Sequence, residues 1–184
     1  MSDKIENGAG ARPRRSKRPA RPEGGPSPTG SAPFRHLVHL PSFRDNPIVF
    51  FTACTFQRRK IRASAKCEEI LCEIWQRPAE HDGWWVGNYV LMPGHVHFFA
   101  RPAANARPKA EWVGMWKSVS SRCVAAALAI EPPIWQSDYF DRYLGSSESY
   151  SDKWQYVEQN AVRAGLVETI DAWPYRGTIH DLMF

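Results

Sequence analysis

The sequence lacks any run of about 18 apolar residues, and charged residues stand near its N-terminus where a secretion signal would need an apolar stretch. We therefore expect a cytoplasmic protein with no membrane-spanning segment. It has only four cysteines, and their positions do not give the paired spacing of zinc sites. Each lies in an apolar or helical context, so we expect reduced cysteines in the core. These residues are Cys54, Cys67, Cys72 and Cys123.

Acidic residues are scarce at the start of the chain. Residues 1–44 contain three Asp or Glu against nine Lys or Arg, whereas the remaining residues contain 16 acidic and 15 basic side chains. The same segment has seven of the 15 prolines and little apolar content, which is typical of disorder. We predict a disordered basic tail over residues 1–44 and one folded domain over residues 45–184. Such a tail suits contact with a polyanion such as nucleic acid, and it is equally typical of a solvated arm with no partner.

The rest of the chain alternates between strand-like and helix-like patterns. Runs of β-branched and aromatic residues predict extended segments over residues 47–56, 84–92, 95–101 and 135–144. Apolar residues at helical spacing predict helices over residues 64–77, 106–130 and 146–165. The predicted buried stripe of the second helix is Trp112, Met115, Val119, Cys123 and Ala126. This order predicts an α+β fold, a ferredoxin-like β-α-β-β-α-β sandwich with an appended C-terminal helix.

Two histidines, His95 and His97, lie one residue apart in the third predicted strand. Alternate side chains of a strand point to the same face, so the two imidazoles should project side by side. Such a pair can converge on one metal ion. The spacing alone is also typical of surface or hydrogen-bonded histidines.

The last predicted helix has two stripes at 3.6 residues per turn. The stripe predicted to be buried is Tyr150, Trp154, Val157, Ala161 and Ala164. The second stripe lies about 100° away on the helix and contains Lys153, Tyr156, Asn160 and Arg163. Tyr156 is therefore not an obvious core residue, and it is either a boundary tyrosine on a mixed surface or a functional one.

Four sequence blocks stand in a fixed order within residues 47–177. The first, Tyr89–His97, contains Met-Pro-Gly-His-Val-His, and the second, Trp135–Arg142, contains Trp-Gln and Phe-Asp. The third, Tyr156–Val167, contains Asn160 and Gly-Leu-Val, and the fourth is Trp173–Tyr175. These blocks resemble those of the IS200-like single-tyrosine (HUH) transposases, and more closely those of the REP-associated tyrosine transposases. The chain departs from the family at three places. Gly94 replaces Asn, Ala161 replaces Pro, and Gly145 stands where relatives often have Arg.

The resemblance implies a metal-dependent endonuclease and strand transferase that acts on single-stranded, hairpin-forming DNA in transposition and recombination. It implies Tyr156 as the nucleophile of a covalent 5′-phosphotyrosine link. It also implies His95 and His97 as ligands of Mg²⁺ or Mn²⁺, with Asn160 in a position to complete the metal site.

Basic side chains are the expected DNA contacts, although each also fits a solvated surface. Those candidates are Arg58, Arg59, Lys60 and Arg62 after the first strand, and Lys153 and Arg163 on the last helix. Two alternatives stay open: a hairpin-DNA-binding protein without turnover, and a metal-dependent hydrolase that uses only the histidine pair. We expect a monomer or a homodimer.

Overall fold

The computed structural model describes residues 47–61, 64–77 and 79–182, so the predicted tail over residues 1–44 lies outside the described residues. The described strands are β1 (Ile48–Cys54), β2 (Trp84–Met92), β3 (His95–Pro102), β4 (Phe140–Leu144) and β5 (Arg176–Thr178). The helices are α1 (Ala65–Trp75), α2 (Ala79–Asp82), α3 (Lys109–Leu128), α4 (Ser147–Glu158) and α5 (Asn160–Arg163), with 3₁₀ turns η1 (Phe56–Arg58) and η2 (Ile170–Ala172). None of these helices is long and apolar enough to cross a membrane.

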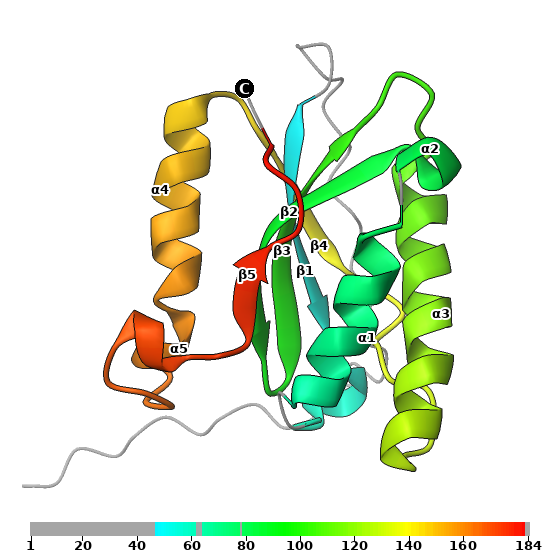
Figure 1. Ribbon diagram of the computed structural model, residues 1–184, viewed down its shortest axis with the longest axis vertical. Coiled ribbons are helices and arrows are strands. Elements are labelled where there is room, and N and C mark those ends of the chain that lie inside the picture. The colour runs from blue at the N-terminus through cyan, green and yellow to red at the C-terminus, as the bar shows by residue number, and fades with distance from the viewer. Residues whose placement is uncertain (1–46, 62–63, 78, 183–184) are drawn as a thin grey trace, which may run out of the picture. The chain divides into compact units, whose positions relative to one another are not determined.

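The strands form one antiparallel sheet in the order β4-β1-β3-β2-β5. Helices α1 and α3 cover one face of this sheet, and α4 covers the other (Figure 1). The first four strands with α1 and α3 therefore make the predicted ferredoxin-like sandwich, and α4 is the appended helix. The sequence analysis missed β5, because three residues are too few to show a strand period.

The larger core lies between the sheet and the α1–α3 pair, and it is rich in aromatic residues. Phe51 stacks on Phe98 with ring centroids 5.0 Å apart, and Trp84 stacks on Trp112 at 4.7 Å. The predicted stripe of α3 is confirmed in part: Trp112 is buried and Met115 and Val119 are partly buried against this core, whereas Cys123 and Ala126 are exposed. The buried residues there are Trp112, Val113, Trp116, Lys117, Ser120 and Val124.

Ser120 explains part of this error. Its hydroxyl accepts a 2.8 Å hydrogen bond from the Trp135 indole, so a polar residue is buried where apolar spacing predicts none. The face that carries Cys123 turns outward, and this cysteine is exposed, contrary to the prediction that all four cysteines belong to the core. Cys67 is buried as predicted.

The second core lies between the sheet and the α4–α5 segment. Val157 and Ala161 are buried there against Phe99 and Trp173. The helix predicted to run to residue 165 is present as two helices, α4 and α5, which are separated at Gln159 although the backbone angles of this residue stay right-handed helical. The predicted buried stripe still faces the sheet at Ala161, and it ends before Ala164, which is exposed.

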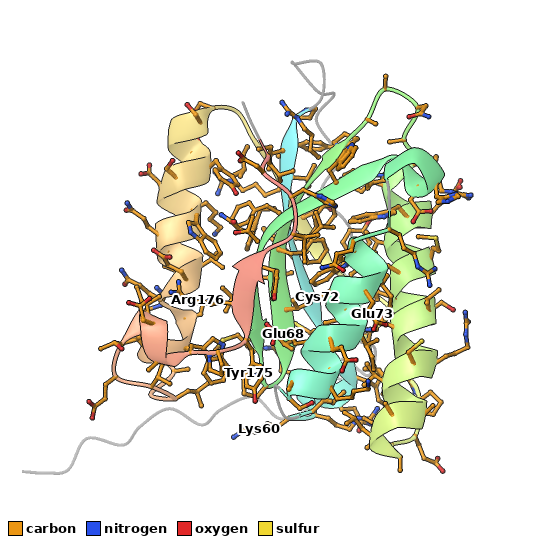
Figure 2. All side chains as sticks on the ribbon, in the orientation of Figure 1. Lys60, Glu68, Cys72, Glu73, Tyr175 and Arg176 are labelled. Carbon is orange, nitrogen blue, oxygen red and sulfur yellow. The ribbon has the colours of Figure 1, made fainter. Side chains whose placement is uncertain are left out.

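The chain after α5 returns to the sheet. Trp173 donates its indole N–H to the Leu91 carbonyl at 3.1 Å, and β5 pairs with β2. Arg176 at the start of β5 lies 3.5 Å from the Glu158 carboxylate at the end of α4. In Figure 2 the labelled Arg176 lies between β5 and α4. Since β4 and β5 occupy opposite edges of the sheet, α4 and α5 must cross its whole face.

Candidate functional site

The histidine pair opens β3 and points toward the α4 side of the sheet. His95 and His97 have ring centroids 4.6 Å apart with the rings inclined at 75°. Val96 and Phe98 belong to the core on the other face, so the alternation predicted from the sequence is confirmed. The two imidazoles are therefore neighbours on one surface.

His97 is oriented by β1. The Thr52 hydroxyl lies 2.8 Å from the His97 Nδ1, and the Phe50 ring stacks on the imidazole at 5.5 Å between centroids. With Nδ1 engaged by Thr52, Nε2 is the ring atom left for a ligand. A hydrogen bond to the second ring nitrogen is a usual way in which proteins orient a metal-binding histidine.

Burial keeps both imidazoles neutral. Burial lowers the pKa of His97 to about 3, and the charges of His95, Lys153 and Arg163 add to this effect. Burial, and then the charge of Arg58, also lowers the pKa of His95. The neutral imidazole is the form that binds a metal ion, so this pair is ready to do so at neutral pH.

Tyr156 stands on α4 between two cations. Its side chain is 58% exposed. The Arg163 guanidinium lies 3.9 Å and the Lys153 ammonium 5.1 Å from the centre of its ring. Lys153 also lies 4.5 Å from the centre of the Phe50 ring, which stacks on His97. These contacts connect the tyrosine to the histidine pair through one lysine and one aromatic ring.

Asn160 begins α5, directly after the break at Gln159. Its side-chain oxygen accepts a hydrogen bond from Arg163, the residue that covers Tyr156. Within the described ranges, no group of three or more His, Cys, Asp or Glu side chains could hold a metal ion. A divalent ion held by the two imidazoles would therefore have to take its other ligands from neutral protein oxygens, DNA or water.

The predicted basic cluster after β1 divides into side chains with different surroundings. Arg58 is near enough to lower the pKa of His95. Arg59 instead donates to the carbonyls of Glu131 and Pro133, which ties down the chain before β4. Lys60 is exposed beside a separate apolar hollow, and Arg62 lies outside the described residues.

The turn that precedes His95 is held by this same loop. The Thr55 amide donates to the Gly94 carbonyl at 3.0 Å, and the Thr55 hydroxyl donates to the Arg59 carbonyl at 2.7 Å. Gln57 and Arg58 have left-handed backbone angles, with φ of 53° and 52°. A non-glycine residue at such an angle costs free energy, so packing against the Gly94 turn must hold the loop in place.

A hollow of about 330 Å³ adjoins Tyr156 on the β4 side. Its lining consists of Arg142, Tyr143, Leu144, Gly145, Ser149, Asp152, Lys153 and Tyr156. The sequence analysis missed Arg142 as a site residue, and it also missed Phe50 and Thr52. The available signal was the polar Thr52 within an apolar strand, together with the position of Arg142 at the end of the Trp135–Arg142 block.

A comparison of sequences shows the family of this chain, and a comparison of structures shows its fold. A family model described as "Transposase IS200 like" matches residues 47–160. A solved REP-associated tyrosine transposase bound to a REP hairpin superposes with a TM-score of 0.54 at 15% identity, covering 74% of this chain and 88% of that one. A candidate transposase from Deinococcus radiodurans R1 gives a TM-score of 0.47 at 16% identity, covering 67% of this chain and 97% of that one. No curated protein matches the sequence.

Proposed function

Because the chain belongs to the IS200-like transposase family, we propose that it is a metal-dependent single-stranded DNA endonuclease and strand transferase that cleaves through Tyr156. The observation that carries this proposal is the position of an exposed tyrosine, between two cations, on the same sheet face as two neutral imidazoles. A tyrosine used only for packing would gain nothing from this exposure.

The proposed reaction is a transesterification at one DNA phosphate. The Tyr156 oxygen loses its proton and attacks phosphorus, the bond from phosphorus to the 3′ oxygen breaks, and that oxygen leaves as a 3′ hydroxyl after taking up a proton. The product is a 5′-phosphotyrosine, which keeps the phosphoester bond available for rejoining to another 3′ hydroxyl. Lys153 and Arg163 would neutralise the phosphate oxygens beside the ring.

His95 and His97 would hold a divalent ion, with the Asn160 side-chain oxygen as a third ligand once it is released from Arg163. When bound, Mg²⁺ or Mn²⁺ withdraws charge from the phosphate and orients it. Imidazole and amide donors together suit Mn²⁺ better than Mg²⁺, although both take oxygen ligands. Thr52 would keep the His97 ring turned toward the ion.

We infer that the substrate is hairpin-forming DNA, because the REP-associated transposase that shares this fold was solved with a REP hairpin. The site offers basic and aromatic groups around an exposed nucleophile, which suits a flexible single strand beside a duplex. The alternatives are binding without cleavage, and hydrolysis by the histidine pair alone.

The test is a labelled DNA hairpin with an unpaired tail, incubated with Mn²⁺ or Mg²⁺ and run on a denaturing protein gel. We expect a labelled protein band that disappears in Tyr156→Phe and on addition of chelator. Tyr175→Phe is the matched control, because Tyr175 packs on Trp173 at 5.3 Å between ring centroids, within the second core. Cleavage that survives in Tyr156→Phe would support the hydrolase, and tight binding without cleavage would support the binding protein.

A further inference from the structure

We propose that the surface between β4 and α4 binds one unpaired nucleotide of the DNA, with its base stacked on Phe140 and its phosphate between Arg142 and Lys153. This inference rests on the proposed function, because the bound nucleotide would be the one next to the phosphate that Tyr156 would attack. The ligand class is a single-stranded nucleotide rather than a base pair.

Exposed aromatic side chains gather at this surface. Among the described residues, five large apolar or aromatic side chains are exposed, and Phe140 and Tyr156 are two of them. Phe140 is 55% exposed although β4 also carries the buried Leu144 on the same face. An apolar ring left this open in water offers a flat surface for a base, and stacking of this kind tolerates any base.

Phe140 is joined to the proposed nucleophilic site by a short series of rings. Its ring meets the edge of Phe50 at 6.3 Å between centroids, and Phe50 stacks on His97 at 5.5 Å. The β1–β4 register places Phe140 opposite Thr52, the residue that holds His97. A base on Phe140 would therefore lie next to the histidine pair without covering it.

Two cations lie on the same side of the sheet as this ring. Arg142 lies two residues from Phe140 on the same face of β4, and it lines the hollow of about 330 Å³ together with Lys153. Burial lowers the pKa of Lys153, and the charges of Arg142 and Arg163 lower it further. Among the described residues no ion pair involves any of these three cations. A phosphate in the hollow would relieve their mutual repulsion.

The hollow has the size and polarity for this group. Its volume falls in the range of small-ligand pockets. Asp152 is the single carboxylate among its lining residues, which also include the cations Arg142 and Lys153. A carboxylate at this place would repel a phosphate but accept a hydrogen bond from the amino group of a base. The lining thus suits one phosphate held by the two cations rather than a run of phosphates.

The experiment uses Tyr156→Phe as the background, so that the DNA stays intact. The probes are a DNA hairpin with an unpaired thymidine tail carrying one 2-aminopurine beside the duplex, and the same hairpin without a tail. Fluorescence anisotropy gives both affinities, and quenching of 2-aminopurine reports stacking. Phe140→Ala should weaken binding of the tailed hairpin by about 5- to 150-fold and abolish the quenching, with the tail-less hairpin unaffected.

Two further variants make the result specific. Phe140→Trp should retain the quenching, because it keeps an aromatic ring. Leu166→Ala is the control, because it removes another exposed apolar side chain. Arg142→Ala should lower the slope of log affinity against log salt by about one for the tailed hairpin. Equal losses on both hairpins, or no loss on either, would overturn the proposal.

The two proposals fail separately. A covalent protein–DNA band together with an unchanged tail affinity in Phe140→Ala would refute the nucleotide site and leave the nuclease standing. A tail affinity that depends on Phe140 without any covalent band would support the nucleotide site and refute the nuclease.

Discussion

Replacing His97 with glutamine should make the free energy of unfolding fall less steeply as the pH becomes acidic. Burial lowers the pKa of His97 to about 3 in the folded protein, against an ordinary value of 6.5. Between these two values the unfolded chain binds a proton that the folded chain does not. The free energy of unfolding therefore falls as the pH decreases through 6.5, and it stops falling near the folded pKa.

The size of the effect follows from the shift. Each pH unit between the two pKa values changes the free energy of unfolding by up to about 1.4 kcal/mol. From pH 6.5 to about pH 4.5 the His97 contribution amounts to about 2 kcal/mol, since the slope grows as the unfolded side chain becomes protonated. His95 contributes in the same direction, because burial lowers its pKa as well.

The assay is urea unfolding of chelator-treated protein, followed by circular dichroism at several pH values in this range. His97→Gln shifts the stability at every pH, so the quantity compared is the slope of stability against pH. A slope in His97→Gln equal to that of the wild type would refute the burial argument.

Three other changes test the site. Arg163→Ala removes the guanidinium that lies 3.9 Å from the centre of the Tyr156 ring. It should reduce the rate of covalent adduct formation by about 10- to 100-fold without changing the circular dichroism spectrum, and an unchanged rate would exclude a role for this cation. Thr52→Val removes the hydroxyl on the His97 Nδ1 and should weaken Mn²⁺ binding by about 10- to 100-fold in calorimetry, whereas equal affinity would contradict the orienting role. Gly145→Arg places a cation where an added side chain meets open space, and should steepen the salt dependence of DNA binding by about one; a loss of binding would refute the expected phosphate contact.

The parts of the fold that the sequence predicted have strong local signals. β2 spans residues 84–92 as predicted, because a segment rich in aromatic and β-branched residues ends at Pro93-Gly94. α1 starts where predicted, because the Ser64 hydroxyl accepts from the Cys67 amide. The break at Gln159 has no such signal, since Gln and Ala161 both tolerate a helix and tertiary packing decides the geometry there.

The sequence could predict those features of the site that depend on a single strand or helix. Strand alternation set the face of His95 and His97, and helical period set the exposure of Tyr156. The polar Thr52 stood out in its apolar strand, but its contact with His97 and the place of Phe140 were not predictable, because both depend on the register between strands far apart in the sequence. That register is a property of the folded sheet rather than of any one segment.

The opposite-edge placement of β4 and β5 governs how two copies of this chain could associate. An exchange of the tyrosine helix between copies would first have to unpair β5 from β2 and withdraw the Trp173 indole from the Leu91 carbonyl. It would also have to lift Val157 out of the second core. Both ends of the helix segment are thus bound to the sheet of their own chain. Association that leaves these contacts intact keeps nucleophile and histidines in cis, so each copy would carry a complete set of reacting groups.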